Sequence, residues 1–299
     1  VGSEMCIRDR IEREGGDPAR ETLTLVKTHQ GECFTYDREG GLWRMYLFVE
    51  DTVSYDLPDT PALFELSGEA FGKFQRQMGG FPADSLHETI HDFHNTPARY
   101  RQLEDAIARN EAGRLGDVTA EIEFCRQYER EVHALLDAME AGEIPLRVTH
   151  NDTKLNNVLL DRQTGRGVCV IDLDTVMPGL TAYDFGDAIR TGANTAEEDE
   201  RDLSRVQFSL PMFEAFTRGF LKEAGQTLTA REIELLPMGA KLMTLECGMR
   251  FLADHLQNDI YFKIHRENHN LDRARTQFKL VADMEAKWDQ MNAIVEKYL

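Results

Sequence analysis

The stretch that decides the fold is residues 147–190, RVTHNDTKLNNVLLDRQTGRGVCVIDLDTVMPGLTAYDFGDAIR. His150 and Asp152 follow a short strand pattern, and Asn157 comes five positions after Asp152. Apolar segments at 158–160 and 168–172, separated by the turn DRQTGRG, then predict a β-hairpin that ends at Asp172. Because paired strands lie next to each other, Asn157 and Asp172 are expected at one rim of the same sheet.

This order of side chains is the one that phosphoryl transfer requires. Asp152 is placed to take or orient the proton of an attacking hydroxyl, as a catalytic base. The amide oxygen of Asn157 and the carboxylate of Asp172 are placed to hold Mg²⁺ against the phosphates. A solvated loop with Asx turns is the alternative, and it accounts for an isolated Asp-x₄-Asn spacing. The added His, the hairpin and the strand-terminal Asp favour the phosphotransferase; we expect His150 to fix the loop by hydrogen bonds.

The tripeptide Asp184-Phe185-Gly186 offers a competing metal ligand. Asp172 already ends the strand where a ligand belongs, and Asp174, two positions later, is expected to assist it. We therefore rank Asp172 first, Asp174 second and Asp184 third. Asp184 is expected to cap the helix that follows or to bond the catalytic-loop backbone.

The flanking sequence predicts an α/β (α+β) fold that is mainly helical after its first quarter. Residues 21–27 and 42–49 are rich in β-branched and aromatic residues, which predicts strands of a small antiparallel sheet. Residues 50–61 predict a loop. A strand is expected at 145–149, and apolar residues at three- and four-residue steps predict helices over 61–78, 118–139, 208–224, 231–256 and 271–298. His87, His91 and His94 have helical spacing that fits a metal-binding face, but an amphipathic helix end is favoured there.

Composition excludes several classes of partner. The 299 residues contain 34 basic and 53 acidic side chains, a net charge of −19, which argues against binding nucleic acid or an anionic membrane. No run of about 18 apolar residues predicts a membrane span. The five cysteines form no CxxC pair and no secretory signal is visible, which predicts a reducing, cytoplasmic setting. Nothing in the sequence indicates an oligomeric state.

Several motifs resemble those of the aminoglycoside phosphotransferase and choline kinase superfamily, which has a protein kinase-like fold. They are HNDTKLNN, IDLDTVMPG and YDFGDAIR. Three further segments are similar in sequence to the N-acetylhexosamine 1-kinase branch of this superfamily: WRMYLFVEDTVSYDL, ECGMRFLADHLQNDIYF and HNLDRARTQ. The similarity extends from about residue 10 to the C-terminus.

The resemblance implies a two-lobed, ATP- and Mg²⁺-dependent kinase. It would phosphorylate the anomeric hydroxyl of N-acetylglucosamine or N-acetylgalactosamine, a small amino-sugar substrate, to the sugar 1-phosphate. By the motif, Asp152 is the catalytic base, and Asn157 and Asp172 are the Mg²⁺ ligands. Arg250 and Tyr261 match sugar-pocket positions. The segment from Phe48 to Glu50 matches the hinge, whose backbone would hold adenine.

The start of the chain departs from the family pattern. Residues 1–9 resemble an adapter-derived, non-native segment, residues 10–50 a remnant of the nucleotide-binding lobe, and residues 51–299 the catalytic and substrate-binding lobe. A glycine-rich turn and a phosphate-binding strand Lys are not recognisable, so we expect a truncated gene whose product is inactive as given. Two alternatives remain open: a kinase of the same superfamily with choline, an aminoglycoside or another sugar as acceptor, and a non-catalytic, pseudokinase-like binding module.

Overall fold

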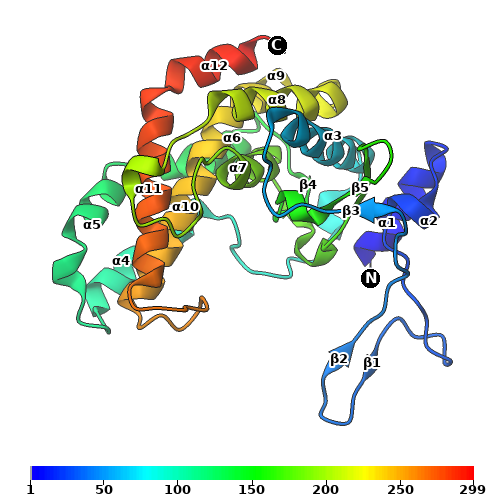
Figure 1. The fold of residues 1–299 in the computed structure, drawn as a ribbon, viewed down its shortest axis with the longest axis horizontal. Coiled ribbons are helices and arrows are strands. Elements are labelled where there is room, and N and C mark those ends of the chain that lie inside the picture. The colour runs from blue at the N-terminus through cyan, green and yellow to red at the C-terminus, as the bar shows by residue number, and fades with distance from the viewer. Residues whose placement is uncertain (1) are drawn as a thin grey trace.

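Short antiparallel sheets and longer helices alternate in the computed structural model, which describes residues 2–299 (Figure 1). The helices are α1 (Gly2–Arg13), α2 (Pro18–Glu21), α3 (Pro61–Met78), α4 (Thr96–Arg109), α5 (Thr119–Arg126), α6 (Ala134–Glu140), α7 (Thr181–Gly192), α8 (Leu210–Ala224), α9 (Ala230–Glu234), α10 (Leu236–Leu256), α11 (His269–Ala286) and α12 (Trp288–Glu296). The strands are β1 (Thr35–Tyr36), β2 (Leu42–Trp43), β3 (Thr52–Val53), β4 (Arg147–Thr149), β5 (Val158–Asp161), β6 (Gly167–Val170) and β7 (Met177–Gly179). The mixed helix and sheet fold that the sequence predicts is confirmed.

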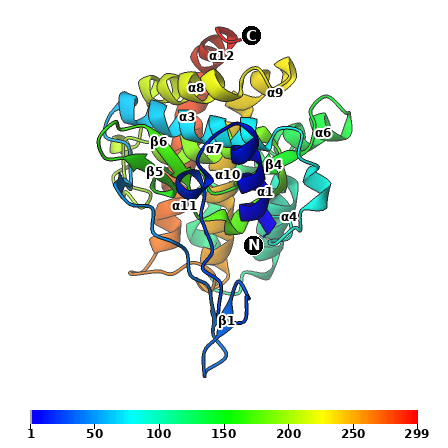
Figure 2. The same cartoon turned by 90° about the vertical axis from the view of Figure 1, so that its right-hand side faces the viewer.

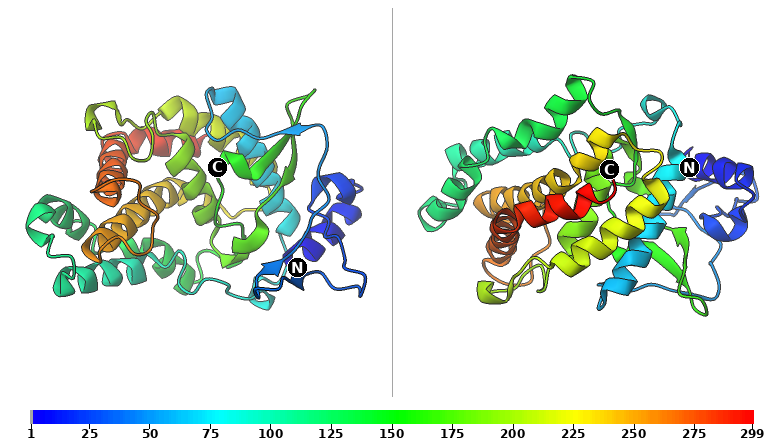
Figure 3. Two further views of the ribbon diagram at one scale, coloured as in Figure 1. Left: turned by 60° about the horizontal axis from the view of Figure 1, so that its bottom comes forward. Right: turned by 90° about the horizontal axis from the view of Figure 1, so that it is seen from above.

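Side-chain caps and prolines decide where the long helices begin. Thr60 accepts a hydrogen bond from the backbone N–H of Leu63 and Pro61 opens α3, while Ser209 caps α8 in the same way. These two helices lie side by side in both views of Figure 3. They approach closely because Gly219 of α8 faces the backbone of α3. Phenylalanines from α3, α7 and α8 fill the core beneath them.

The predicted hairpin is present and organises the centre of the molecule. Strand β5 pairs with β6 in antiparallel register, with Val158 opposite Val170. Strand β3 adds to the other edge of β5, where the sequence predicts only a loop; its two residues are too few to produce a strand pattern. Strand β4 pairs with β7, so that the segments before and after the hairpin also meet.

The strands predicted at 21–27 and 42–49 are largely wrong in extent. Leu25 faces Tyr46 in an isolated bridge, and only Leu42 and Trp43 of the second segment form a strand, in the hairpin β1–β2. This hairpin projects away from the helical body (Figures 1 and 2). Most of its side chains are exposed, so little packing stabilises a longer ladder.

The single helix predicted over 118–139 is also wrong, since α5 and α6 are separate. Cys125, Tyr128, Val132 and Leu135 are all buried on the core side across the interruption. The break therefore costs no apolar contact, and the periodicity of the sequence does not reveal it. Within residues 2–299, no helix combines the length and the apolar character that crossing a membrane would need.

The segment set aside as non-native, residues 1–9, contributes to α1. Ile7 and Ile11 are buried against Phe74 and Met78 of α3. Val1 lies outside the described residues. The origin of the segment stays a prediction.

Candidate active site

One face of α7 holds the backbone loop that follows β4. The carboxylate of Asp184 accepts hydrogen bonds from the backbone N–H groups of His150 and Asn151, at 3.0 and 2.8 Å. Three residues further along α7, Asp187 accepts one from the N–H of Thr153 at 2.9 Å. Residues three apart share a helix face, so α7 fixes the loop at both ends. Of its two predicted roles, Asp184 has the loop-bonding one.

His150 is a fixed part of the loop. Its ring lies edge-on to the rings of Phe71 and Phe74, with centroids 5.6 and 5.8 Å away. Its Nε2 lies 2.8 Å from the carbonyl oxygen of Ile171, and its Nδ1 accepts the backbone N–H of Asp152 at 3.3 Å. Both ring nitrogens are therefore committed to backbone groups, which agrees with the expected positioning role.

Asp152 lies between two polar neighbours. Its Oδ1 is 2.8 Å from the Nζ of Lys154, and its Oδ2 accepts a hydrogen bond from Nδ2 of Asn157 at 3.1 Å. About a quarter of the Asp152 side chain is exposed, 25%. Burial lowers the pKa of Lys154, but the Asp152 carboxylate outweighs it and the pKa is raised, so Lys154 is a cation at neutral pH. Two of the three predicted residues are thus in direct contact.

Asp172 lies at the rim where Asn157 enters β5. The carbonyl oxygen of Asn157 accepts the backbone N–H of Ile171 at 2.9 Å, which places Asp172 next along the chain. Asp172 adopts left-handed backbone angles, φ 59° and ψ 57°, and its exposed carboxylate makes no ion pair within residues 2–299. An amide oxygen and a free carboxylate fit Mg²⁺, which prefers hard oxygen ligands. Asp174 instead forms an ion pair with Arg44.

A cavity of about 520 Å³ opens beside Asp172, and we call it the hinge cavity. Phe48 and Val49 lie in its wall, whereas Glu50 does not. The carbonyl oxygen of Glu50 accepts a hydrogen bond from Arg20 at 3.0 Å. The remaining wall is mostly apolar; it includes Leu23, Val53, Leu159, Ile171 and Leu173.

A second cavity, of about 580 Å³, lies on the other side of Asp152 and is called the α10 cavity. Asp152, Arg250 and Tyr261 all line it, although they lie about a hundred residues apart in the sequence. The Arg250 guanidinium carbon is 5.4 Å from the ring centres of Phe93 and Phe262 and 5.9 Å from that of Tyr261. Three aromatic faces thus position one cation.

The carboxylates of the α10 cavity are already paired. Arg250 and Lys263, which also line it, have no carboxylate partner within residues 2–299. The cavity therefore presents unpaired positive charge to its contents. The paired groups are Asp152 with Lys154 (2.8 Å), Asp187 with Arg190 (2.9 Å), Glu198 with Arg190 (3.0 Å) and Glu246 with His94 (2.9 Å).

Asp254 holds the loop that carries Tyr261. Its Oδ1 accepts the backbone N–H groups of Ile260 and Tyr261, at 3.0 and 2.8 Å, and its Oδ2 accepts that of Phe262 at 2.9 Å. A buried carboxylate with three backbone donors fixes a loop firmly. Sequence reasoning does not find Asp254, because nothing local distinguishes it from other helical carboxylates.

Two other residues escape the sequence analysis. Asp187 has a visible signal, the Asp-x-x-Asp spacing of Asp184 and Asp187 on one helix face. His94 is grouped with His87 and His91 on a helix by the sequence, but residues 87–95 are not helical, so the amphipathic helix end favoured there is wrong. His91 is exposed while the His94 side chain is only 8% exposed, so these histidines share no face.

Comparison with known proteins was made on the sequence and on the fold. The phosphotransferase enzyme family matches residues 14–221, more than half of the chain. A microcompartment-associated aminopropanol kinase aligns with a TM-score of 0.63 at 18% identity, over 97% of this chain and 82% of that one.

Two further solved structures share the fold. A choline/ethanolamine kinase family protein from Mesorhizobium loti has a TM-score of 0.52 at 16% identity, over 98% of this chain and 83% of that one. The GDP complex of aminoglycoside 2'-phosphotransferase-IIIa has a TM-score of 0.54 at 13% identity, over 96% of this chain and 83% of that one.

Proposed function

The chain belongs to the phosphotransferase enzyme family, and we propose that it transfers the γ-phosphoryl group of ATP to the anomeric hydroxyl of an N-acetylhexosamine. It is a phosphotransferase that acts on an alcohol group. N-acetylglucosamine and N-acetylgalactosamine are the proposed acceptors, and the product is the sugar 1-phosphate.

The observation that carries this proposal is the convergence of Asp152, Arg250 and Tyr261 on the α10 cavity. A planar guanidinium with free donors suits the carbonyl oxygen of an N-acetyl group, and an aromatic ring suits the apolar face of a sugar. Asp152 is then the base next to the reacting hydroxyl. The proposal assigns Arg250 and Tyr261 to sugar recognition.

The charge of the same cavity argues against cationic acceptors. Choline, ethanolamine and aminoglycosides carry positive charge, and a site that recognises them needs a carboxylate free to pair with it. Every carboxylate lining the α10 cavity already has a cationic partner, while Arg250 has none within residues 2–299. A neutral N-acetyl amide is not repelled by the positive charge of Arg250. The charge of the cavity therefore favours an N-acetylated sugar over a cationic acceptor.

In the proposed reaction, Asp152 accepts the proton of the anomeric hydroxyl as that oxygen bonds to the γ-phosphorus. The bond from phosphorus to the β,γ-bridging oxygen breaks, and ADP leaves. Lys154, 2.8 Å from Asp152, holds the carboxylate in place. Asn157 and Asp172 would hold Mg²⁺, which neutralises phosphate charge when bound.

The hinge cavity is the proposed adenine site. Its apolar wall suits a flat aromatic base, and Asp172, the proposed Mg²⁺ ligand, also lines it. The backbone from Phe48 to Glu50 offers the polar atoms for the edge of the base. This site lies where the proposed nucleotide segment, residues 10–50, meets the proposed catalytic lobe, residues 51–299.

Because no glycine-rich turn and no phosphate-binding strand Lys are recognisable before residue 42, the test measures ADP release by the chain extended at its N-terminus with both parts, which we call the completed chain. N-acetylglucosamine and N-acetylgalactosamine are expected to turn over, whereas choline and kanamycin are not. Glucosamine is the matched control, because it replaces the neutral amide by an ammonium; its kcat/KM should be at least about 10-fold lower. A ³¹P NMR signal of an anomeric phosphate identifies the product. Turnover with a cationic acceptor alone would refute the N-acetylhexosamine assignment.

Asp152→Asn is the companion variant. It should abolish turnover and leave nucleotide binding intact, because Asn accepts no proton and the hinge cavity does not contain Asp152. Isothermal titration with ADP measures the binding. An active Asp152→Asn protein would show that another group is the base.

A further inference from the structure

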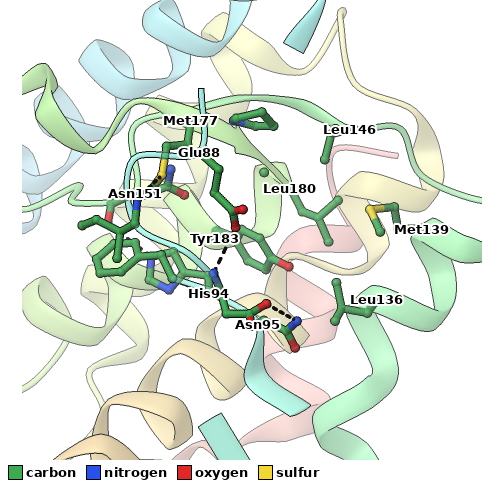
Figure 4. Close-up of a pocket in the computed structure, with 15 residues that line it drawn as sticks. Glu88, His94, Asn95, Leu136, Met139, Leu146, Asn151, Met177, Leu180 and Tyr183 are labelled. Carbon is green, nitrogen blue, oxygen red and sulfur yellow. Dashed lines mark hydrogen bonds between the residues drawn. The ribbon is translucent and has the colours of Figure 1, made fainter. Parts of the chain in front are cut away.

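His94 lies in a wall between two cavities. One is the α10 cavity, and the other, of about 170 Å³, lies between β7 and α6. Figure 4 shows His94 and Asn151 on one side of this smaller cavity and Leu136 and Met139 of α6 on the other. The ring of His94 packs between the rings of Phe93 and Tyr183, with centroids 4.5 and 5.4 Å away. The proposed function gives this buried imidazole no role.

Both ring nitrogens of His94 contact acceptors. Nδ1 is 2.9 Å from Oε1 of Glu246, and Nε2 is 3.2 Å from the carbonyl oxygen of Asn151. The other oxygen of Glu246 accepts the hydroxyl of Thr96 at 2.8 Å. A neutral imidazole has only one N–H, so His94 donates to both oxygens at once only when its ring is doubly protonated. Burial lowers the pKa of His94, but the Glu246 carboxylate outweighs this, and the pKa is raised.

The backbone of Asn151 has a conformation that is uncommon for a residue other than glycine. It has a positive φ of 67°, which costs a non-glycine residue conformational energy. Its backbone N–H is bonded to Asp184, and its side-chain amide donates to the carbonyl oxygen of Thr175 at 2.8 Å. The carbonyl oxygen of Asn151 is bonded to His94. This carbonyl group belongs to the peptide unit that joins Asn151 to Asp152. His94 therefore restrains the carbonyl half of the peptide unit leading into Asp152, while His150 holds its N–H half.

We infer that the His94–Glu246 pair is a positioning device that aims the carboxylate of Asp152 into the α10 cavity. The inference rests on the proposed function. Glu246 belongs to α10, one turn before Arg250, so a single helix both lines the acceptor site and anchors the loop of the catalytic base. The pair thus fixes the distance between the base and the acceptor, which controls turnover more than binding.

Two substitutions at position 94 separate positioning from bulk. His94→Ala removes the ring and both contacts. His94→Gln keeps a donor that reaches the carbonyl oxygen of Asn151 and fills most of the space. We expect kcat to fall about 10- to 100-fold in His94→Ala, with KM for ATP and acceptor within about 2-fold of wild type. His94→Gln should recover most of the lost kcat.

Lys241→Met is the matched control. Lys241 is also a buried charged residue of α10, paired with Glu131 and Glu285 on the side away from the cavity. Its substitution should lower the thermal midpoint and leave kcat unchanged. Wild-type kcat in His94→Ala would overturn the inference. So would an equal loss in His94→Ala and His94→Gln, because the donor to Asn151 would then be irrelevant.

Hydrogen exchange of the full chain tests the same inference without turnover. Peptides spanning residues 150–157 should exchange faster in His94→Ala than in wild type, and at nearly the wild-type rate in His94→Gln and Lys241→Met. Unchanged exchange in His94→Ala would overturn the inference. If the completed chain turns over none of the acceptors, the proposed function fails, and the exchange data alone decide whether His94 restrains the loop.

Discussion

At the scale of single residues, three aspartates near one another have different environments. Asp152 is half-buried beside a lysine, Asp172 is exposed with left-handed backbone angles, and Asp184 is fully buried among backbone donors. Burial raises the pKa of Asp184, whereas the donors and the nearby His150 oppose that rise. A carboxylate committed to backbone N–H groups is a structural element, and one that is free and exposed is available to a cation.

This contrast predicts different effects of the same substitution. Asp172→Asn should weaken Mg²⁺-dependent nucleotide binding and leave the thermal midpoint near that of wild type. Asp184→Asn should cost about 2–3 kcal/mol of unfolding free energy. The two oxygens of Asp184 accept from the N–H groups of His150 and Asn151, whereas a side-chain amide has only one acceptor oxygen. Titration with ADP, with and without Mg²⁺, and urea unfolding measure the two effects. Loss of metal dependence in a stable Asp184→Asn protein would reverse the ranking.

A buried ion pair gives the unfolding free energy a defined pH dependence. The Glu232 side chain, 2% exposed, bonds Arg147 at 2.6 Å, and Arg147 begins β4. Burial raises the pKa of Glu232, but the Arg147 guanidinium outweighs it, and the pKa is lowered from 4.5. The stabilisation is therefore present above pH 4.5 and is lost as the pH falls through the folded-state pKa.

Glu232→Gln should accordingly destabilise the protein by roughly 1–3 kcal/mol at neutral pH, since it leaves the half-buried Arg147 without its carboxylate partner. The difference from wild type should shrink in acid, where Glu232 is protonated in both folded and unfolded chains. Urea unfolding across the pH range checks this. A difference that stays constant into acid would mean that the lost contact is not ionic.

At the scale of elements, the crossing of α3 and α8 depends on glycine. A Cβ atom on Gly219 would lie 2.1 Å from the carbonyl oxygen of Glu65, which is backbone and cannot move aside alone. Gly219→Ala should therefore destabilise the protein by about 1–3 kcal/mol, despite the higher helix propensity of alanine. Gly116→Ala is the control, because no atom lies within 4 Å of its added Cβ. Equal thermal midpoints for the two variants would contradict the close approach.

At the scale of the whole molecule, the projecting β1–β2 hairpin and the chain after it expose apolar side chains. Leu42 and Met45 are 58% and 65% exposed, and neither lines the hinge cavity. Exposed apolar surface of this kind promotes association. The double substitution Leu42→Ser, Met45→Ser should reduce light scattering at high concentration without changing the thermal midpoint. Leu299→Ser, which alters an equally exposed residue at the other end of the chain, should leave scattering unchanged.

The sequence alone determined the central hairpin, most helices and the local part of the candidate site. These features depend on short-range patterns: apolar segments on either side of a turn, the spacing of Asp152 and Asn157, and apolar residues at three- and four-residue steps. The sequence also predicted a structural role for Asp184 but left capping and loop bonding open, and the structure shows loop bonding. Such signals are local because backbone hydrogen bonds and side-chain periodicity act over a few residues.

The tertiary structure decided what lies far apart in the chain. It brought Arg250 and Tyr261 to Asp152, joined His94 to Glu246, and placed Asp254 under the loop that carries Tyr261. It also broke the predicted helices at 118–139, 231–256 and 271–298 and shortened the first strands. A helix face or a strand edge is stable only with a partner, and which distant segment becomes that partner is a property of the packed molecule rather than of either segment's own residues.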